Sequence, residues 1–317
     1  MAGQVWFADT LGGFMYSDQL SDYLRTELQP MMRFRQFTDL QEAIGYGKGE
    51  QFHWNVYSDL EDDGGELQEQ EAMPESNFTI SQGTLVVTEY GNSAPFTKKL
   101  DDLSKHPVQE VIKKVLKHDA AKTLDRAAYS QFAATRLLVT PTGGNSTDSV
   151  TFEVGATTST VNNVPLGKEH VKVIVDEMKE RDIPGYDNDE YFSIARTRTF
   201  RPIKNDLESI YQNIESGARR IYMGEIGLYE GTRFVEQTNI ARKNWSNNQS
   251  DEAFFFGGDT VTEGVVEYEQ IRGKIPSDYG RSKGIAWYYL GGFGIAHNNP
   301  TDATASQNRI VKWTSAS

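Results

Sequence analysis

The sequence predicts a mixed α+β fold, and three observations support that prediction. Apolar residues recur at helical spacing over residues 104–132, which indicates one long amphipathic helix. Short runs rich in β-forming residues, such as 51–57 and 84–90, indicate strands. Helical and strand segments are interspersed along 317 residues, and no repeat with a period of about 20–50 residues is present. A chain of this length is expected to form about two compact units.

Composition places the chain among globular proteins and excludes several classes of function. Hydrophobic residues make up 38% of the sequence, and 28 glycines add to that share. The net charge of −13 argues against a protein that binds nucleic acid with its whole surface. The absence of cysteine excludes disulfides, thiolate catalysis, zinc–cysteine sites and iron–sulfur clusters. We expect no signal peptide and no membrane span, because the longest apolar stretch, 284–296, is shorter than about 20 residues.

Residues 1–35 are predicted to form an arm rather than part of a compact unit. Two glycine-rich patches flank polar and aromatic residues, and a short amphipathic helix follows, with Ser17 as its cap and Pro30 as its end. The apolar face of this helix comprises Leu20, Tyr23, Leu24 and Leu28. So short a helix cannot bury its apolar face alone, and we expect it to contact another part of the fold or another chain.

Residues 45–100 are predicted to form a long, projecting, two-stranded element. Its strands are expected at 51–57 and 84–90, and Gly91-Asn92 is expected to form a turn. The connecting segment is too polar to pack. Between positions 49 and 97 there are ten Asp or Glu and no Lys or Arg, so this element carries most of the net charge.

The beginning of the acidic segment resembles a calcium-binding loop. Asp59, Glu61 and Asp63 stand at its first, third and fifth positions and Gly64 at the sixth, which suits a hard cation. The twelfth position is Gln70 rather than a bidentate Glu, and neither flank is predicted to be helical. A solvated or partner-facing acidic loop is therefore the preferred interpretation.

The remaining elements follow in chain order. Ser104 is the predicted cap of the long helix, and Pro107 lies in its first turn. Further helices are predicted at 168–181 and at 205–216, the second with Asn205 as its cap. The predicted strands are 136–140, 150–154, 191–197, 220–226, 232–237, 261–270, 284–296 and 309–313.

The long helix and the helix predicted at 168–181 each have a predicted buried face. The stripe of the long helix comprises Val108, Val111, Ile112, Val115, Leu116, Ala120, Leu124, Ala127, Ala128 and Phe132. The face of the second helix comprises Val171, Ile174, Val175 and Met178.

No arrangement of residues indicates catalysis. No two of the five histidines stand at metal-binding spacing on one helix, and the sequence has no nucleophile elbow, phosphate loop or dinucleotide fingerprint. We therefore predict no enzymatic activity, no catalytic residue, no metal site and no cofactor. The glycine-rich run Gly291–Gly294 lacks a following helix that would bind phosphate. It is predicted to be a strand on which large neighbours pack close to the backbone.

Read in order, the chain gives an arm, an acidic β-extension, a very long helix and an α+β body. This order resembles the major capsid proteins of tailed bacteriophages, whose fold also forms the herpesvirus capsid floor, and it is most similar to a short-tailed phage subfamily. The residues that carry the resemblance are Phe34–Asp39, Gly47–Gly49 leading into Phe52–Leu60, His106–Phe132 with its Asp125-Arg126, Gly224–Gly227 and Gly231–Glu236.

The resemblance implies a domain organisation. Residues 1–38 would be the N-terminal arm and residues 39–103 an extended acidic β-loop. Residues 104–164 and 258–317 would form a peripheral domain with a spine helix, and residues 165–257 an axial domain. Some relatives cross-link a lysine of the extended loop to a neighbour's asparagine, but positions 49–97 contain no lysine, so we do not expect that chemistry.

The resemblance also implies partners. The protein would assemble with itself into hexamers and pentamers, forming an icosahedral head that encloses double-stranded DNA without sequence-specific binding. A separate scaffolding protein, a portal protein and optionally a decoration protein would be its other partners, and it would bind no membrane. The expected location is the virion, with assembly in the host cytoplasm.

Oppositely charged groups are the candidate contacts between subunits. The acidic candidates lie in the extension: Asp59, Glu61, Asp62, Asp63, Glu66, Glu69 and Glu71. The basic candidates are the helix lysines Lys113, Lys114 and Lys117, or the cluster Arg196, Arg198 and Arg201, in which Arg196 and Arg198 are expected on one face of a strand. A solvated loop whose charge keeps the shell soluble is the alternative.

Two other classes of function remain open from the sequence. A soluble acidic hydrolase would hide its site among the carboxylates and would show a pocket lined by acids of raised pKa. A β-rich adhesin or receptor-binding virion protein would show a secretory leader or a repeat-rich β-fibre, and we find neither pattern.

Overall fold

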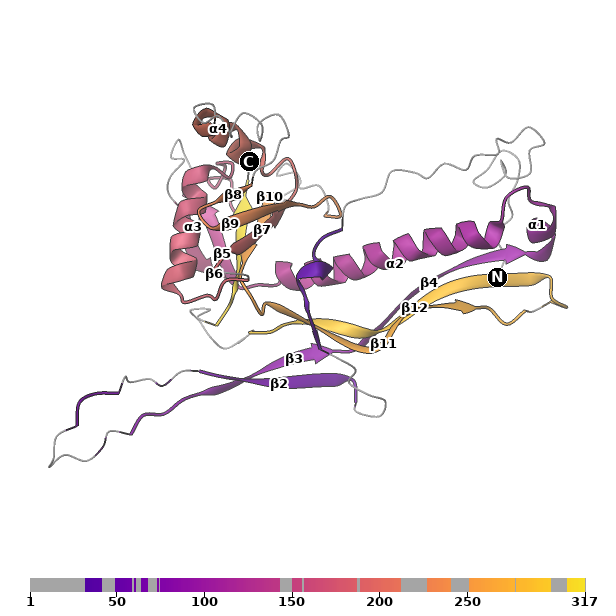
Figure 1. Ribbon diagram of the computed structural model, residues 1–317, viewed down its shortest axis with the longest axis horizontal. Coiled ribbons are helices and arrows are strands. Elements are labelled where there is room, and N and C mark those ends of the chain that lie inside the picture. Colours follow the sequence, from indigo (N-terminus) through magenta and orange to yellow (C-terminus); the bar gives the residue numbers. More distant parts are fainter. Residues whose placement is uncertain are drawn as a thin grey trace.

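The protein is elongated, with a compact unit at one end and a long helix lying along a narrow sheet (Figure 1). A two-stranded hairpin projects beneath the compact unit. The computed structural model describes residues 32–41, 49–58, 60, 64–67, 73, 75–142, 150–155, 157–186, 189–211, 227–240, 251–276, 278–297 and 307–316.

A seven-stranded sheet forms the centre of the compact unit, with the strand order β6-β5-β13-β10-β7-β9-β8. Its strands are β5 (Leu137–Pro141), β6 (Val150–Val154), β7 (Tyr191–Ala195), β8 (Leu228–Tyr229), β9 (Thr232–Glu236), β10 (Asp251–Phe256) and β13 (Ile310–Ser315). Strand β10 is not among the predicted strands, because its run of three phenylalanines does not alternate with polar residues. The strand is buried and pairs with β13 on one side and β7 on the other, so both of its faces accept apolar side chains.

Two helices pack against this sheet. In α3 (Lys168–Glu180) the predicted face is confirmed, since all four of its apolar residues are buried. The second helix, α4 (Arg201–Tyr211), begins four residues before the predicted cap, so Asn205 lies inside the helix and is exposed. The earlier start lets Phe200 and Ile203 join Leu207 in the core. The predicted end of this helix lies outside the described residues.

The long helix α2 (Val108–Ala133) covers one side of a four-stranded sheet with the order β1-β11-β12-β4. The strands are β1 (Asp39–Gln41), β4 (Thr88–Thr97), β11 (Val261–Gly273) and β12 (Ser282–Ile295). The helix has 26 residues, which corresponds to about 39 Å. Its buried apolar residues recur at every fourth position: Val108, Ile112, Leu116, Ala120, Leu124, Ala128 and Phe132.

The start of the long helix and the width of its stripe differ from the prediction. Ser104 ends the short helix α1 (Lys98–Leu103) instead of capping α2, and the chain turns before α2 begins at Val108. Because α2 touches the sheet along one narrow line, Val115 points away and is 60% exposed.

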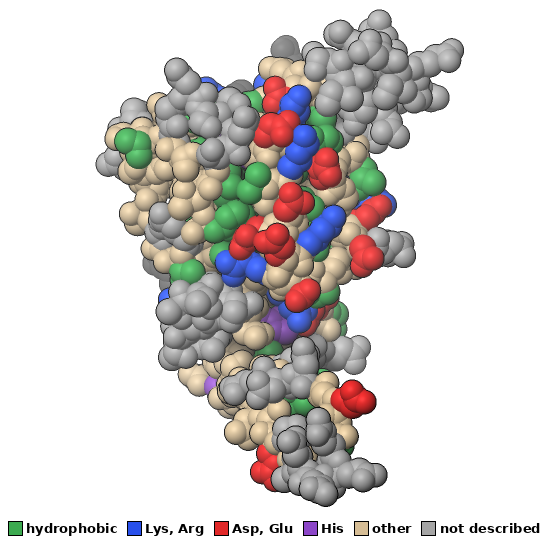
Figure 2. All heavy atoms as spheres, turned by 90° about the vertical axis from the view of Figure 1, so that its left-hand side faces the viewer, with side chains coloured by type: hydrophobic (Ala, Val, Ile, Leu, Met, Phe, Trp, Pro, Cys, Tyr) green, Lys and Arg blue, Asp and Glu red, His purple; other side chains and the backbone are tan. Residues whose placement is uncertain are grey.

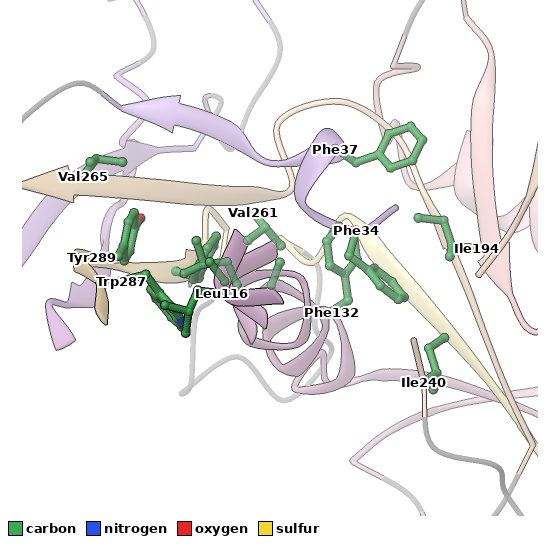
Figure 3. Close-up of a cluster of buried hydrophobic side chains, with 14 of the residues drawn as sticks. Phe34, Phe37, Leu116, Phe132, Ile194, Ile240, Val261, Val265, Trp287 and Tyr289 are labelled. Atoms are coloured by element: carbon green, nitrogen blue, oxygen red, sulfur yellow. The ribbon is translucent and has the colours of Figure 1, made fainter. Parts of the chain in front are cut away.

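The segment Phe34–Phe37 joins the two sheets and the long helix. The ring of Phe34 contacts that of Phe132 (Figure 3). Phe34 also contacts Phe254, and Phe37 contacts Phe256. Both side chains belong to the same buried cluster as the apolar stripe of α2. The amphipathic helix predicted within residues 1–31 lies outside the described residues, as does the strand predicted at 220–226.

The hairpin consists of β2 (Gln51–Tyr57) and β3 (Ile80–Val86), which pair antiparallel over their full length. The strand predicted at 84–90 is wrong in its bounds, because the chain leaves the hairpin at Val87 and enters β4. The turn predicted at Gly91-Asn92 is also wrong, since both residues lie inside β4 and pair with β12. Gly91 serves close packing instead: a Cβ there would lie 2.9 Å from the carbonyl oxygen of Trp287.

Candidate functional site

Two of the histidines form hydrogen bonds that support the fold. His170 is buried and accepts a hydrogen bond from the backbone N–H of Gly167 at the start of α3. His53 lies 2.9 Å from the hydroxyl of Thr84 across the hairpin. No three His, Asp or Glu side chains within the described ranges converge on a point where a metal ion could bind. The helices in those ranges also include none long and apolar enough to cross a membrane.

The distal part of the hairpin carries a group of exposed apolar side chains. Tyr57 is 77% exposed and pairs with Ile80, which is 63% exposed, at the distal end of the paired strands. The other members are Leu60, Leu67, Met73 and Phe78 in the segment that connects the strands. We call these six residues the apolar group of the hairpin. Side chains of this size gathered on one projection are typical of an interaction surface.

The hairpin is also acidic, whereas the compact unit balances its charges. Figure 2 shows acidic and basic side chains interleaved over the end of the molecule where α3 lies. There Lys172 pairs with Glu169 and Arg181 with Glu177. The hairpin, at the bottom of the view, shows acidic but no basic side chains. Of the acidic candidates, Glu66 is exposed, while Asp59, Glu61, Asp62, Asp63, Glu69 and Glu71 lie outside the described residues.

The three candidate lysines of the long helix are free to receive a partner. Lys113, Lys114 and Lys117 are all exposed on α2, and none of them forms an ion pair within the part of the chain that the structure describes. Val115 and Leu103, on α2 and α1, are the exposed apolar residues nearest to them in the sequence. This end of the helix therefore offers positive charge and exposed apolar side chains, which complement the acidic charge and the apolar group of the hairpin.

The arginine cluster is less available than the sequence predicts. Strand β7 ends at Ala195, so Arg196 and Arg198 lie in the turn that leads into α4 and not on one strand face. The guanidinium of Arg196 donates to the carbonyl of Ile240. Lys204 pairs with Glu236 at 2.5 Å. Arg198 and Arg201 stay exposed, so two of the three arginines of the cluster present charge to a partner.

A groove separates the distal hairpin from the body of the protein. It encloses about 430 Å³ and extends from Phe52 and Trp54 to Tyr57 along the hairpin; Asp259, His297 and Arg309 are among the residues that line it on the body. The Asp259 carboxylate lies 2.7 Å from His297 Nε2 and 3.2 Å from Arg309 Nη1. These contacts lower the pKa of Asp259, the hydrogen bond to His297 being the largest cause. The groove is thus lined by an ionised carboxylate that is already paired, and not by the acid of raised pKa that a hydrolase would need.

At its base the hairpin crosses strand β12 in close contact. Trp54 Nε1 donates to the carbonyl of Ala296 at 2.7 Å, and Leu85 is fully buried. Two glycines make room: a Cβ on Gly83 would lie 2.3 Å from the Trp54 ring, and one on Gly292 would lie 2.1 Å from the carbonyl oxygen of Val86. The prediction that neighbours pack close to the backbone of Gly291–Gly294 is confirmed. The sequence analysis missed the anchoring role of Trp54; the only signal was a glycine within the facing strand.

No family model and no curated protein matches this sequence. Solved structures do match along nearly the whole chain. The capsid of Ralstonia phage GP4 aligns with a TM-score of 0.68 and 12% identity, covering 99% of this chain and 98% of that one. The capsid of Cyanophage P-SCSP1u aligns with a TM-score of 0.67 and 9% identity, covering 95% and 93%.

This chain has the bacteriophage capsid fold. A third structure, from the capsid asymmetric unit of Cyanophage Pam1, gives a TM-score of 0.66 at 15% identity and covers 97% of this chain and 99% of that one. Because the identities are so low, the likeness is one of fold. The capsid fold predicted from the order of arm, extension, long helix and α+β body is confirmed, and the short-tailed subfamily stays a prediction.

Proposed function

We propose that this protein is the structural subunit of an icosahedral phage head and has no enzymatic role. The main support is that the match to the GP4 capsid spans 99% of the chain, so the projecting hairpin and the long helix belong to the shared fold. A fold alone does not establish a function, and the hairpin supplies the second argument. Its exposed apolar group and its unbalanced acidic charge are surfaces that a monomer leaves unpaired.

The subunit would associate with itself in hexamers and pentamers, in the virion, around double-stranded DNA. Closed symmetric assembly requires complementary surfaces on every copy, which the hairpin and the long helix can supply. An acidic protein would retain DNA by enclosing it. It would not bind the DNA tightly, because binding phosphates requires many Lys and Arg side chains. Scaffolding, portal and decoration proteins are proposed as partners on the resemblance alone.

We further propose that the hairpin of one subunit lies on the long helix of its neighbour. The apolar group would cover Val115 and Leu103, and the hairpin carboxylates would face Lys113, Lys114 and Lys117. The helix is preferred over the arginine cluster because its lysines have no ion pair within the described residues, whereas Arg196 is already bonded to Ile240. Each exposed ion pair contributes only about 0–1 kcal/mol, but the contact recurs at every interface of a shell.

A charge swap tests this arrangement. Replacing Lys114→Glu together with Lys117→Glu is expected to leave the subunit folded and to lower the yield of shells, because acidic side chains would then face each other. Adding Asp62→Lys and Asp63→Lys to the same chain is expected to restore assembly. Yield is measured by sedimentation and electron microscopy over a range of salt concentrations, since screening weakens such pairs.

The matched control is Lys179→Glu, an exposed lysine on α3 far along the chain from the proposed contact. It changes the net charge by the same sign and is expected to leave assembly intact. If the helix variant assembles with unchanged yield and unchanged salt dependence, the acidic hairpin has only the solubility role. If the unaltered protein forms no large particles under any condition, the capsid function itself is wrong.

A further inference from the structure

The base of the hairpin is packed tightly against strand β12. Gly292 lets the backbone of β3 approach β12, since a Cβ there would lie 2.1 Å from the carbonyl oxygen of Val86, and Gly83 leaves room for the Trp54 ring on the paired strand β2. Leu85 lies beside Gly292 with no exposed surface, and Trp54 closes the contact through its hydrogen bond to Ala296. We call Trp54, Gly83, Leu85, Gly292 and Ala296 the crossing.

The contacts of the crossing leave the hairpin little freedom to tilt relative to β12. At Gly292 the neighbouring atom is the carbonyl oxygen of Val86, and a backbone atom cannot move aside by changing a rotamer. A third glycine, Gly294, lies under Thr84, where a Cβ would be 3.1 Å from the carbonyl oxygen. Strand β3 therefore rests on two glycines of β12, Gly292 and Gly294, and its direction is set by these backbone contacts.

Contact between the hairpin and the body loosens away from the crossing. A groove of about 430 Å³ runs along the hairpin from Phe52 and Trp54 to Tyr57, with His297 and Arg309 among the residues on the side of the body. Beyond Tyr57 the described residues of the connecting segment are almost all exposed. The hairpin is thus fixed at one point and unsupported beyond it.

From this contrast we infer that the crossing is a rigid joint that aims the hairpin at the neighbouring subunit, so that any bending during assembly occurs beyond Trp54. The inference rests on the proposed capsid function. Strands rise about 3.3 Å per residue, so a site ten residues beyond the joint lies about 30 Å away, and a tilt of about 10° would displace it by about 5 Å. Such a displacement would separate the apolar group and the carboxylates from their targets. Trp54, Gly83 and Gly292 are in this sense positioning residues.

Substitutions at the joint test the inference. Gly83→Ala pushes a methyl group into the Trp54 ring, and Trp54→Phe removes the donor to Ala296 while keeping an aromatic ring. Both are expected to leave the circular dichroism spectrum of the subunit unchanged and to lower the yield of closed shells by about tenfold, or to change their diameter, as for other sites that depend on sub-ångström positioning. The matched control is Gly273→Ala, in β11 of the adjoining sheet, where nothing lies within 4 Å of the added Cβ.

A reversible cross-link provides a second test, in which the oxidised and the reduced forms of one variant are compared, so that any cost of the substitutions is common to both. A Cβ on Gly294 would lie 3.3 Å from Leu85 Cβ, close to the separation of about 3.5–4.5 Å found in disulfides. The chain contains no cysteine, so Leu85→Cys with Gly294→Cys would give one defined bond across the joint. A rigid joint predicts equal shell yields from the oxidised and the reduced protein. A yield that falls on oxidation and recovers on reduction would mean that the joint itself moves, and the inference would be wrong.

The failures are distinguishable. If the unaltered protein and Gly273→Ala both assemble, and Gly83→Ala and Trp54→Phe give shells of the same yield and diameter, the joint does not aim the hairpin and the capsid function stands. If the unaltered protein forms no particles, the capsid function is overturned and the inference with it.

Discussion

Asp259 is a carboxylate whose ionisation ties the end of β12 to the start of β13. The hydrogen bond to His297 and the charges of His297 and Arg309 lower its pKa from the ordinary value of 3.8, while partial burial works in the opposite direction. Asp39, nearby, has a raised pKa, first because of burial and then because of the charge of Asp259. The favourable contacts of Asp259 are thus partly offset by repulsion from a second carboxylate.

The stabilisation by Asp259 should depend on pH in a defined direction. Because the pKa is lower in the folded than in the unfolded protein, the contribution is fully present above about pH 4 and is lost as the pH falls through the folded-state value. Asp259→Asn is expected to lower the free energy of unfolding at about pH 7 by less than about 1 kcal/mol, since the side chain is 58% exposed and solvent screens its contacts.

Urea denaturation of the unassembled subunit at about pH 7 and about pH 2 measures this effect. The difference between Asp259→Asn and the unaltered protein should be present at the higher pH and disappear at the lower one. Asp102→Asn, an exposed carboxyl on α1, is the control and should show no difference at either pH. A loss of stability that is equal at both pH values would contradict the assignment to ionisation.

Single residues also mark where sequence reasoning was insufficient. Asp125 was part of the resemblance but had no role assigned; in the structure its carboxylate accepts hydrogen bonds from the Phe34 N–H, from Gln237 and from Asn239. These partners are separated from it by about a hundred residues, so no local pattern could indicate them. Gly91 was predicted as a turn because glycine is common in turns, whereas here it permits close approach of two strands.

Among the elements, the segment that enters the fold at residues 32–41 is held by a buried ion pair. Arg35 donates from Nε and Nη2 to Glu263 on β11, at 3.1 and 2.8 Å, and the side chain of Glu263 is only 4% exposed. The Tyr289 hydroxyl donates to the same carboxylate at 2.9 Å. β1 then pairs parallel with β11, so the ion pair fixes the register of the segment.

Arg35→Ala is expected to destabilise the subunit by about 3–5 kcal/mol, because it leaves the Glu263 carboxylate buried without a counter-charge. Glu269→Gln serves as the matched comparison, since Glu269 also pairs with Arg35 but is largely exposed, and it should cost less than about 1 kcal/mol. Thermal and urea unfolding measure both. Equal costs for the two variants would mean that burial of Glu263 does not determine the strength of the clamp.

Helices whose apolar residues recur at regular spacing could be predicted from the sequence. Elements whose position depends on packing against other parts of the fold could not. The periodicity of α2 and α3 located both helices to within a few residues, because one face of each meets a core. The start of α4 and the strand β10 depend on tertiary burial of Phe200 and of three adjacent phenylalanines, which has no signature in local spacing. The hairpin was predicted, but its exit into β4 at Val87 was not, since both strands use the same residue types.

For the whole molecule, the order of the elements carried more information than any motif. The order of arm, acidic extension, long helix and α+β body, through its resemblance to tailed-phage capsid proteins, predicted the capsid fold at identities of 9–15% to solved capsids. The candidate contacts could be named by charge alone. Their exposure could not be predicted from the sequence: the structure shows Arg196 bonded to Ile240, whereas all three helix lysines are exposed.

Deletions in the N-terminal arm test how folding and assembly are divided along the chain. The sequence gives residues 1–30 an amphipathic helix without a local partner, while the structure places Phe34, Arg35 and Phe37 in the body of the same subunit. The segment needed for assembly should therefore end, and the segment needed for folding begin, between about residues 28 and 34.

Deleting residues 1–28 is expected to leave a folded monomer that does not form shells. Deleting residues 1–38 is expected to unfold it, because two phenylalanines leave the core at a cost of about 3–5 kcal/mol each. Circular dichroism and thermal unfolding report the fold, and sedimentation velocity with electron microscopy reports assembly. Normal shells from the shorter deletion would show that the arm is dispensable, and a folded product of the longer one would show that residues 32–38 belong to the arm and not to the core.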